Sequence, residues 1–499
     1  MTFHLVRPLA AVAIAVMIAS LSAPAATAAA LPERSDRPPT PHLDWTPCPD
    51  APDADCATLE VPVDWSQPKG ETFELAVARH RATDPDARVG AMVFGPGGPG
   101  DSGVERITTG IDRFSERLQA RFDIVSFDPR GVGASSPLRC SADLVAQMPP
   151  VVMRDETAFE SMRTFAGRLR ADCREHTGPV YEHMSTLDTV RDLEALRRAL
   201  GEPRLTFHGS SYGTLLGQQY AAAHPHRVRA MVLESVNDHS LGARRFLDGS
   251  ARAAQDTFDE FVTWCHRDQE CPLRDSDVNA LLRDLVQRAE RGELSDPDDP
   301  HRALTPYDLT FTEVQRRLYD PERRPELAAR LAALAAAPEP TAGTGERAGQ
   351  GGAGEGSAGA VIPLPIPIFC NDWEMQPSSY ADYERTLERM RDRAPDLPYP
   401  GALIAPALCL GAPPAANPQR PIDVAPGAPI LLVNSRHDPA TPHAWAQSLE
   451  RKLRGRGVLL TYEGSGHGAY TSSPCVERIV DAYLIDGEVP PRNASCPTT

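Results

Sequence analysis

Lysine occurs at only two positions of this 499-residue sequence, Lys69 and Lys452, so arginine carries nearly all of the positive charge. Acidic residues outnumber lysine and arginine by 68 to 51, and the formal net charge is −17 at pH 7. No stretch interleaves basic and aromatic residues. Because binding to a phosphate backbone depends on clustered cations, this composition argues against nucleic acid as a partner.

Metal-binding spacings are also absent. The ten cysteines include no C-x-x-C pair, and the sequence has no H-E-x-x-H. We therefore predict no metal site and no cofactor. An even number of cysteines in an exported chain predicts disulfides instead, although spacing alone does not fix the pairing. Joining sequential neighbours is the most economical arrangement and gives Cys48–Cys56, Cys140–Cys173, Cys265–Cys271, Cys370–Cys409 and Cys475–Cys496.

An apolar run long enough to span a membrane is missing as well. The run at residues 8–21 is short for a bilayer, follows Arg7, and precedes the small-residue cleavage signature Ala26-Thr27-Ala28. Residues 1–30 therefore predict a cleaved signal peptide. We expect a secreted, monomeric protein with no stable membrane association.

The pentapeptide Gly209-Ser210-Ser211-Tyr212-Gly213 has the pattern G-x-S-x-G. A β-prone run at 205–207 precedes it, and residues 214–223 carry leucines and alanines on one helical face. A serine on so sharp a strand-to-helix turn presents its hydroxyl above the sheet, and the glycines let strand and helix pass closely. Alone, the pattern also suits a serine in an ordinary glycine turn, so its context has to decide.

Strand-like and helix-like segments alternate on both sides of this turn. An amphipathic helix is expected at 185–200, and buried strands are expected at 89–94, 122–128, 205–207, 228–233, 429–434 and 457–462. This alternation predicts an α/β fold with a mostly parallel, doubly wound sheet. The glycine-rich loop 95–103 follows directly after a strand, where a serine hydrolase builds half of its oxyanion hole.

The alternation stops between about 239 and 400, where four segments predict helices and none predicts a strand: 243–264, 276–291, 311–337 and 378–393. We interpret 239–400 as a helical cap inserted between two parts of a core, 31–238 and 401–499. Helices packed elsewhere on the surface are the alternative. Within the insertion, 338–360 is a low-complexity Pro, Gly, Ala and Glu segment that predicts no fixed structure.

Three of the predicted strands each deliver one reactive residue at the carboxyl end, in the order Ser211, Asp438 and His467. A serine hydroxyl becomes a good nucleophile when an imidazole takes its proton and a carboxylate orients that imidazole. The order Ser, Asp, His is that of the α/β hydrolases. His437 and His443 are competing bases, but both lie beside the predicted acid rather than after the next strand.

Four motifs together resemble the secreted tripeptidyl aminopeptidases of the α/β-hydrolase family, which also holds the prolyl aminopeptidases. They are Gly97-Gly-Pro-Gly, Gly209-Ser-Ser-Tyr-Gly, Asp438-Pro-Ala-Thr-Pro and Gly466-His467, and the resemblance covers essentially the whole chain after residue 30. It implies an α/β-hydrolase fold with Ser211 as nucleophile, Asp438 as orienting acid and His467 as base. It also implies that the backbone N–H groups of Gly98 and Tyr212 are the oxyanion donors.

The sequence therefore predicts a secreted serine exopeptidase that releases short peptides, which the resemblance implies are tripeptides, from free N-termini through an acyl-enzyme. A carboxylic-ester hydrolase with the same triad is the first alternative, because fold and triad do not fix the acyl substrate. A binding protein without catalytic activity is the second, and the complete triad argues against it.

An aminopeptidase also needs a group that holds the substrate ammonium at a fixed distance from Ser211. Because burying an unpaired ammonium is costly, we expect the cap to supply a carboxylate that points into the cleft. Asp372 is the first candidate, since Cys370 and Trp373 would hold its segment rigid. Glu374 is the second.

Overall fold

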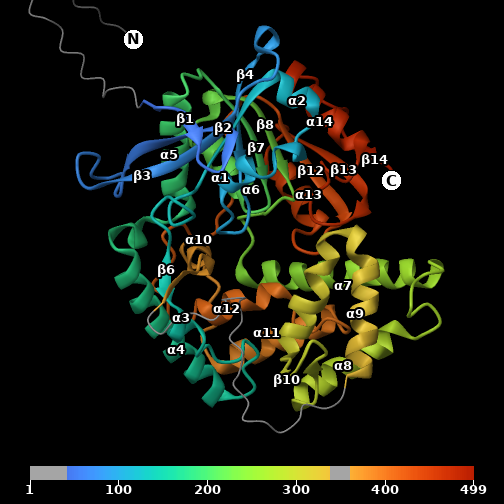
Figure 1. Ribbon diagram of the computed structural model, residues 1–499. Coiled ribbons are helices and arrows are strands. Elements are labelled where there is room, and N and C mark those ends of the chain that lie inside the picture. Colours follow the sequence, from blue (N-terminus) through green and yellow to red (C-terminus); the bar gives the residue numbers. More distant parts are fainter. Residues whose placement is uncertain (1–41, 338–359, 499) are drawn as a thin grey trace, which may run out of the picture. The chain divides into compact units, whose positions relative to one another are not determined.

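The computed structural model describes residues 42–337 and 360–498. The predicted signal peptide lies outside the described residues, and so does the predicted low-complexity segment apart from residue 360. Helices flank a single large sheet, and a second group of helices lies at one end of it (Figure 1).

Ten strands form the large sheet, and the seven that follow one another in space from β5 to β14 run parallel to one another. An antiparallel meander, β1 to β3, extends one edge of this parallel part. In spatial order the strands are β1 (Thr46–Cys48), β2 (Ala51–Pro62), β3 (Thr72–His80), β5 (Phe122–Phe127), β4 (Gly90–Gly95), β7 (Leu205–Ser210), β8 (Val228–Glu234), β12 (Ile430–His437), β13 (Gly457–Ser465) and β14 (Ala494–Cys496).

Both faces of the sheet are covered by helices, as strand β4 shows. Its side chains alternate between two cores: Ala91 and Val93 join one, and Met92 and Phe94 join the other. The first core includes residues of α5 (Thr186–Ala199), α6 (Gly213–Ala223) and α13 (His443–Lys452). The second includes residues of α1 (Gly103–Thr108), α2 (Glu116–Arg121) and α14 (Pro474–Asp486). The predicted doubly wound, mostly parallel α/β sheet is confirmed.

Between β8 and β12 the chain leaves the sheet and forms mainly helices (Figure 1). The longer ones are α7 (Ala243–Arg267), α8 (Val278–Arg291), α9 (Arg324–Ala336) and α11 (Tyr380–Arg393). Shorter elements follow or separate them: η5 (Asp308–Gln315), η6 (Arg317–Tyr319), η7 (Pro321–Arg323), β11 (Val361–Pro363), η8 (Ile366–Ile368), α10 (Phe369–Asp372), η9 (Gly401–Leu403) and α12 (Ile404–Leu408).

Two details of this segment differ from the prediction. Strands occur where none was expected: β9 (Ser295–Asp296) and β10 (Asp299–Ala303) form a short antiparallel pair, and β11 also lies in this segment. The single helix expected at 311–337 is also broken, because Pro321 offers no N–H and disfavours helical geometry at the preceding residue. In its place the chain forms the π-helix η5, two 3-10 turns and α9.

Residues 139–183, assigned to the core from the sequence, pack against the inserted helices. They form β6 (Arg139–Ser141), α3 (Ala142–Val145), α4 (Glu156–Thr177) and η3 (Pro179–His183). β6 pairs with β11 of the insertion, and the ring of Phe159 on α4 lies 6.2 Å from that of Tyr383 on α11. The cap therefore has two parts, one from each side of α5 in the sequence, and the first of them lies within the segment predicted as core.

All ten cysteines are paired, and the five disulfides are those predicted from sequential neighbours. Within residues 42–337 and 360–498, no helix combines the length and the apolar character that crossing a bilayer requires.

Candidate active site

Ser211 occupies the turn between β7 and α6. Its φ is 53°, in the left-handed region that a non-glycine residue adopts only when its surroundings hold it there. The Ser211 N–H donates to the carbonyl of Glu234 at 2.9 Å, and the Thr214 hydroxyl donates to the Ser211 carbonyl at 2.6 Å. A Cβ on Gly213 would lie 2.2 Å from the Gly95 oxygen, so this turn requires glycine there. The sequence pattern therefore folds into the strained strand-to-helix turn that it predicted.

Asp438 and His467 meet at the carboxyl ends of β12 and β13. The imidazole Nδ1 of His467 lies 3.0 and 3.1 Å from the two carboxylate oxygens of Asp438, which is buried. The same carboxylate accepts from the N–H groups of Ala440 and Thr441, both at 2.9 Å, and from the Thr441 hydroxyl at 2.8 Å. This geometry can hold one tautomer of His467, with Nδ1 protonated and Nε2 free to accept a proton.

The loop that carries His467 is fixed from both sides. Gly466 and Gly468 adopt φ values of 112° and 110°, so the histidine sits on a turn between two glycines. Gly466 N–H donates to the carbonyl of His437 at 3.0 Å, and His467 N–H donates to the carbonyl of Tyr319 at 2.7 Å. Tyr319 belongs to η6, so the insertion helps to hold the loop of His467.

The charges around His467 favour its protonated form. Burial alone would lower the pKa of His467, but the adjacent Asp438 carboxylate, with smaller contributions from Glu234 and Asp101, raises this pKa above its ordinary value. An imidazolium formed during a reaction would be stabilised in the same way.

Ser211 and His467 line one cavity of about 820 Å³ between the strand ends and the inserted helices. Gly98 and Tyr212, the predicted oxyanion donors, line it too. A Cβ on Gly97 would come within 3.1 Å of the Ser211 Cβ, so the glycine-rich loop packs directly beside the serine. An apolar region, supplied mainly by α4, α12 and the neighbouring turns, continues the cavity; it includes Met148, Phe165, Leu169, Phe369, Ile404 and Leu408.

The two competing histidines face away from this cavity. His437 Nδ1 lies 2.8 Å from Asp256 on α7, and His443 Nε2 lies 2.9 Å from the Thr461 hydroxyl. Neither residue lines the cavity. Of the three candidate bases, His467 is the one that shares the cavity with Ser211.

Asp372 does not point into the cleft, contrary to the prediction. Its side chain is fully buried, and it accepts hydrogen bonds from the N–H and hydroxyl of Thr186, the Tyr212 hydroxyl and the Asn417 amide. Burial raises the pKa of Asp372, although these hydrogen bonds favour the charged form. With its oxygens already satisfied inside the protein, Asp372 has no place for a substrate ammonium.

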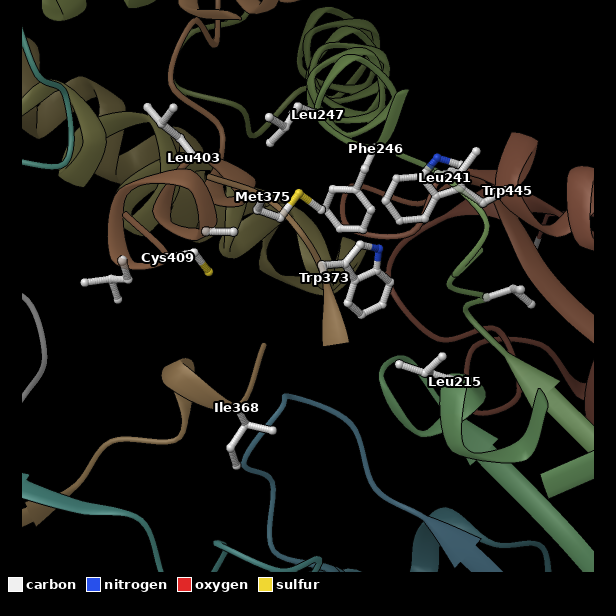
Figure 2. Packing of buried hydrophobic residues seen from close by; sticks show 14 of the residues in the cluster. Leu215, Leu241, Phe246, Leu247, Ile368, Trp373, Met375, Leu403, Cys409 and Trp445 are labelled. Carbon is white, nitrogen blue, oxygen red and sulfur yellow. The ribbon is translucent and has the colours of Figure 1, made fainter. Parts of the chain in front are cut away.

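The reason lies in the neighbouring aromatic residue. Trp373 stacks on Phe369 at 4.7 Å between ring centroids and contacts Phe246 of α7, which in turn packs on Trp445 of α13. Figure 2 shows Trp373, Phe246 and Trp445 in this cluster. The segment is rigid, as expected, but this packing directs the Asp372 carboxylate toward the start of α5. Glu374 is half-buried, accepts from the Ala415 N–H at 2.6 Å and does not line the cavity, so it is no anchor either.

Several charged residues of the cavity were missed by the sequence interpretation. Asp101 is the one carboxylate among the described residues that line it, and Arg106, Arg113 and Arg316 line it as well. Asp101 follows the Gly97–Gly100 loop directly, a position that could have identified it. Arg316 and Tyr319 come from the π-helix region, for which the sequence carried no signal.

Metal coordination finds little support in the part of the chain that the structure describes. The one group with suitable spacing is Cys140, Asp172 and Cys173, but its two cysteines form a disulfide and offer no thiolate.

Comparison with known proteins gives a family match and several full-length relatives. Residues 399–496 match the family described as TAP-like protein. The chain is 31% identical over 488 residues to the serine protease Hip1 of Mycobacterium tuberculosis, covering 91% of each chain. It is 28% identical over 464 residues to the tripeptidyl aminopeptidase of Streptomyces lividans, covering 88% of this chain and 83% of the other.

A relative with a different activity is similar to the same extent. The chain is 29% identical over 469 residues to carboxylesterase B of M. tuberculosis, covering 89% of this chain and 86% of that protein. All three relatives are named as hydrolases, but two of the names are those of peptidases and one is that of an esterase.

Proposed function

Because this chain belongs to the α/β-hydrolase family of the TAP-like proteins, with the serine protease Hip1 and the tripeptidyl aminopeptidases among its members, we propose that it is a secreted serine exopeptidase. It is a serine hydrolase, and in this proposal it releases short peptides, tripeptides first among them, from free N-termini through an acyl-enzyme. The observation that carries the proposal is the covered cavity of about 820 Å³ in which Ser211 and His467 lie.

The proposed reaction uses the three residues in the roles that their chemistry suits. The Ser211 hydroxyl attacks the scissile carbonyl carbon while His467 Nε2 takes its proton, and Asp438 orients the imidazole through Nδ1. The backbone N–H groups of Gly98 and Tyr212 stabilise the oxyanion. His467 then gives the proton to the leaving amine, and a water molecule, deprotonated by His467, hydrolyses the acyl-enzyme.

Asp101 replaces Asp372 and Glu374 as the proposed anchor of the substrate ammonium. It is the one carboxylate among the described residues of the cavity, and its side chain is 41% exposed. Its Oδ2 and the Ser211 Cβ both lie within 3.5 Å of the point where a Cβ on Gly97 would stand. Arg106, at 3.1 Å, pairs with Asp101 but leaves the carboxylate open to the cavity.

Secretion is supported by the disulfides. Five disulfides are stable in an oxidising compartment, whereas cytosolic proteins keep most thiols reduced. This agrees with the signal peptide expected at residues 1–30.

A carboxylic-ester hydrolase is the second candidate. The similarity to carboxylesterase B favours it, and so does the balance of three arginines against one carboxylate along the described cavity wall. A cavity of that charge is less suited to a free ammonium than the sequence alone suggested.

Three substrates with different demands separate the two candidates. A heptapeptide with a free N-terminus, its N-acetyl counterpart and a small activated ester are compared by kcat/KM. The exopeptidase proposal expects the free peptide to be cleaved at least ~100-fold faster than the acetylated one, because acetylation removes the charge that Asp101 holds. Equal rates for the two peptides, or cleavage of the ester alone, would move the esterase to first place.

A further inference from the structure

Glu234 contacts both halves of the catalytic apparatus, although it belongs to neither the triad nor the oxyanion hole. It is the last residue of β8, the strand between those that lead to Ser211 and Asp438, and it is 1% exposed. Its backbone carbonyl accepts from the Ser211 N–H at 2.9 Å. Its carboxylate Oε1 accepts from the N–H groups of Ala469 at 2.8 Å and Tyr470 at 2.7 Å, directly after the loop of His467.

The second carboxylate oxygen faces two cationic or potentially cationic groups. Oε2 lies 3.1 Å from Nε2 of His208, a fully buried residue of β7, and 4.0 Å from the guanidinium of Arg113 after α1. Burial alone would raise the pKa of Glu234, but the hydrogen bond and charge of His208, the charge of Arg113 and the Tyr470 N–H lower it to about 2. These partners therefore favour the carboxylate form of Glu234.

We propose that Glu234 is a positioning residue for the catalytic base: it sets the His467 loop in register with Ser211, and its fixed negative charge stabilises the imidazolium formed during catalysis. The proton that leaves Ser211 stays on His467 Nε2 until it reaches the leaving group, and Glu234 takes no proton at any step. Asp438 orients the ring through Nδ1, whereas Glu234 acts through the backbone that carries the ring.

The charge effect depends on all groups that face the base. Those facing His467 are Asp438 from the β12 end, Glu234 from β8, Asp101 from the glycine-rich loop and Tyr319 from η6, whose ring lies 5.1 Å away. Arg113 and His208 face Glu234 rather than the imidazole. Among these groups, Glu234 can lose its charge by substitution while keeping an oxygen that accepts the two N–H groups.

Glu234→Gln provides that substitution. The amide oxygen can still accept from Ala469 and Tyr470, while the amide nitrogen faces His208. We expect the acid limb of the kcat/KM profile to move about half a pH unit toward lower pH, because the imidazolium of His467 loses a stabilising charge. The plateau of kcat/KM should fall roughly tenfold. A small activated ester is the substrate, so the result does not depend on the proposed aminopeptidase specificity.

Asp481→Asn is the matched control. Asp481 is a buried carboxylate that accepts a hydrogen bond from the Tyr470 hydroxyl at 2.9 Å, and it is not among the charges that mainly set the pKa of His467. It should lower the melting temperature and leave the acid limb in place. If Glu234→Gln also leaves the acid limb unchanged, or Asp481→Asn shifts it equally, Glu234 is a structural residue only and the proposal is overturned.

Glu234→Asp tests the same claim if the glutamine variant does not fold. The shorter side chain keeps the charge but cannot reach both N–H groups, so the acid limb should stay in place while the plateau falls at least ~10-fold. An acid limb displaced to lower pH in this variant would contradict the charge effect.

Discussion

Ser211, Asp438 and His467 each occupy a backbone position that leaves the side chain little choice of direction. Ser211 has a φ of 53°, Asp438 is held by two backbone N–H groups and the Thr441 hydroxyl, and His467 stands between two glycines with positive φ. Groups fixed before the substrate arrives need little reorganisation during the reaction. Thr441, which lines the cavity and holds Asp438, is therefore part of the proposed apparatus, although the sequence analysis gave it no role.

Removing the Ser211 hydroxyl tests its proposed role as the nucleophile. Ser211→Ala should lower kcat on both peptides and esters by about 10⁴-fold or more, because the acyl-enzyme can no longer form. The melting temperature should change little, since the hydroxyl lines a cavity rather than the core. A serine-directed fluorophosphonate should label the wild type and not the variant. Near-normal activity in the variant would refute the nucleophile assignment.

Asp101→Asn tests the proposed anchor. We expect KM for peptides with a free N-terminus to rise roughly 10- to 100-fold, because the ammonium loses its counter-charge, while rates on the acetylated peptide change little. Asp112→Asn is the control: Asp112 is exposed and lies outside the cavity lining. If Asp101→Asn raises KM equally for free and acetylated peptides, Asp101 is not the anchor.

At the scale of elements, five adjacent parallel strands each end at the site. β4 leads to the glycine-rich loop, β7 to Ser211, β8 to Glu234, β12 to Asp438 and β13 to His467. The sequence predicted four of these five ends because each follows a buried run that breaks at a glycine, serine or aspartate. The role of β8 was invisible, because Glu234 looks like the last residue of an ordinary strand until its hydrogen bonds are known.

The contacts made by the cap elements were also hard to predict from the sequence. The aromatic residues around Asp372 indicated a rigid segment, but a sequence does not show which way a carboxylate faces once that segment is packed. Likewise α4 is an ordinary amphipathic helix, and only its contacts with α11 and α12 show that it belongs to the cap.

Asp372 links the cap to the nucleophile turn, since it joins α10 to the start of α5 and to Tyr212. Asp372→Asn should therefore lower kcat/KM for free peptides, acetylated peptides and esters alike, and destabilise the fold by about 2 kcal/mol through the broken hydrogen bonds. Glu374→Gln, two residues away and half-buried, is the matched control and should be near neutral. A loss confined to free-amine peptides would restore Asp372 as an ammonium anchor.

At the scale of the whole molecule, five disulfides cross-link the chain, which has a net charge of −17. They lie in the meander, in both parts of the cap and at the C-terminal edge strand. Cys475–Cys496, with a sequence separation of 21, joins α14 to β14, next to the strand that carries His467. Cross-links of this kind stabilise mainly by restricting the unfolded chain.

Reduction of the disulfides should therefore lower the melting temperature markedly. Closing a single loop as long as that of Cys475–Cys496 contributes roughly 3 kcal/mol to the free energy of unfolding. Alkylation of the denatured, unreduced protein should find no free thiol, and peptide mapping should recover Cys475 joined to Cys496. Free thiols at these two positions would contradict the pairing without affecting the catalytic assignment.

The most direct test of the proposed function is a digest of one unmodified peptide of about ten residues, with the products followed by mass spectrometry from the earliest time points. An exopeptidase that works from free N-termini produces a short N-terminal fragment first, and the remaining peptide then loses further fragments in order. We expect this ladder for the wild type and its disappearance in Ser211→Ala. Internal cleavage as the first event, or an intact peptide beside a hydrolysed ester, would contradict it.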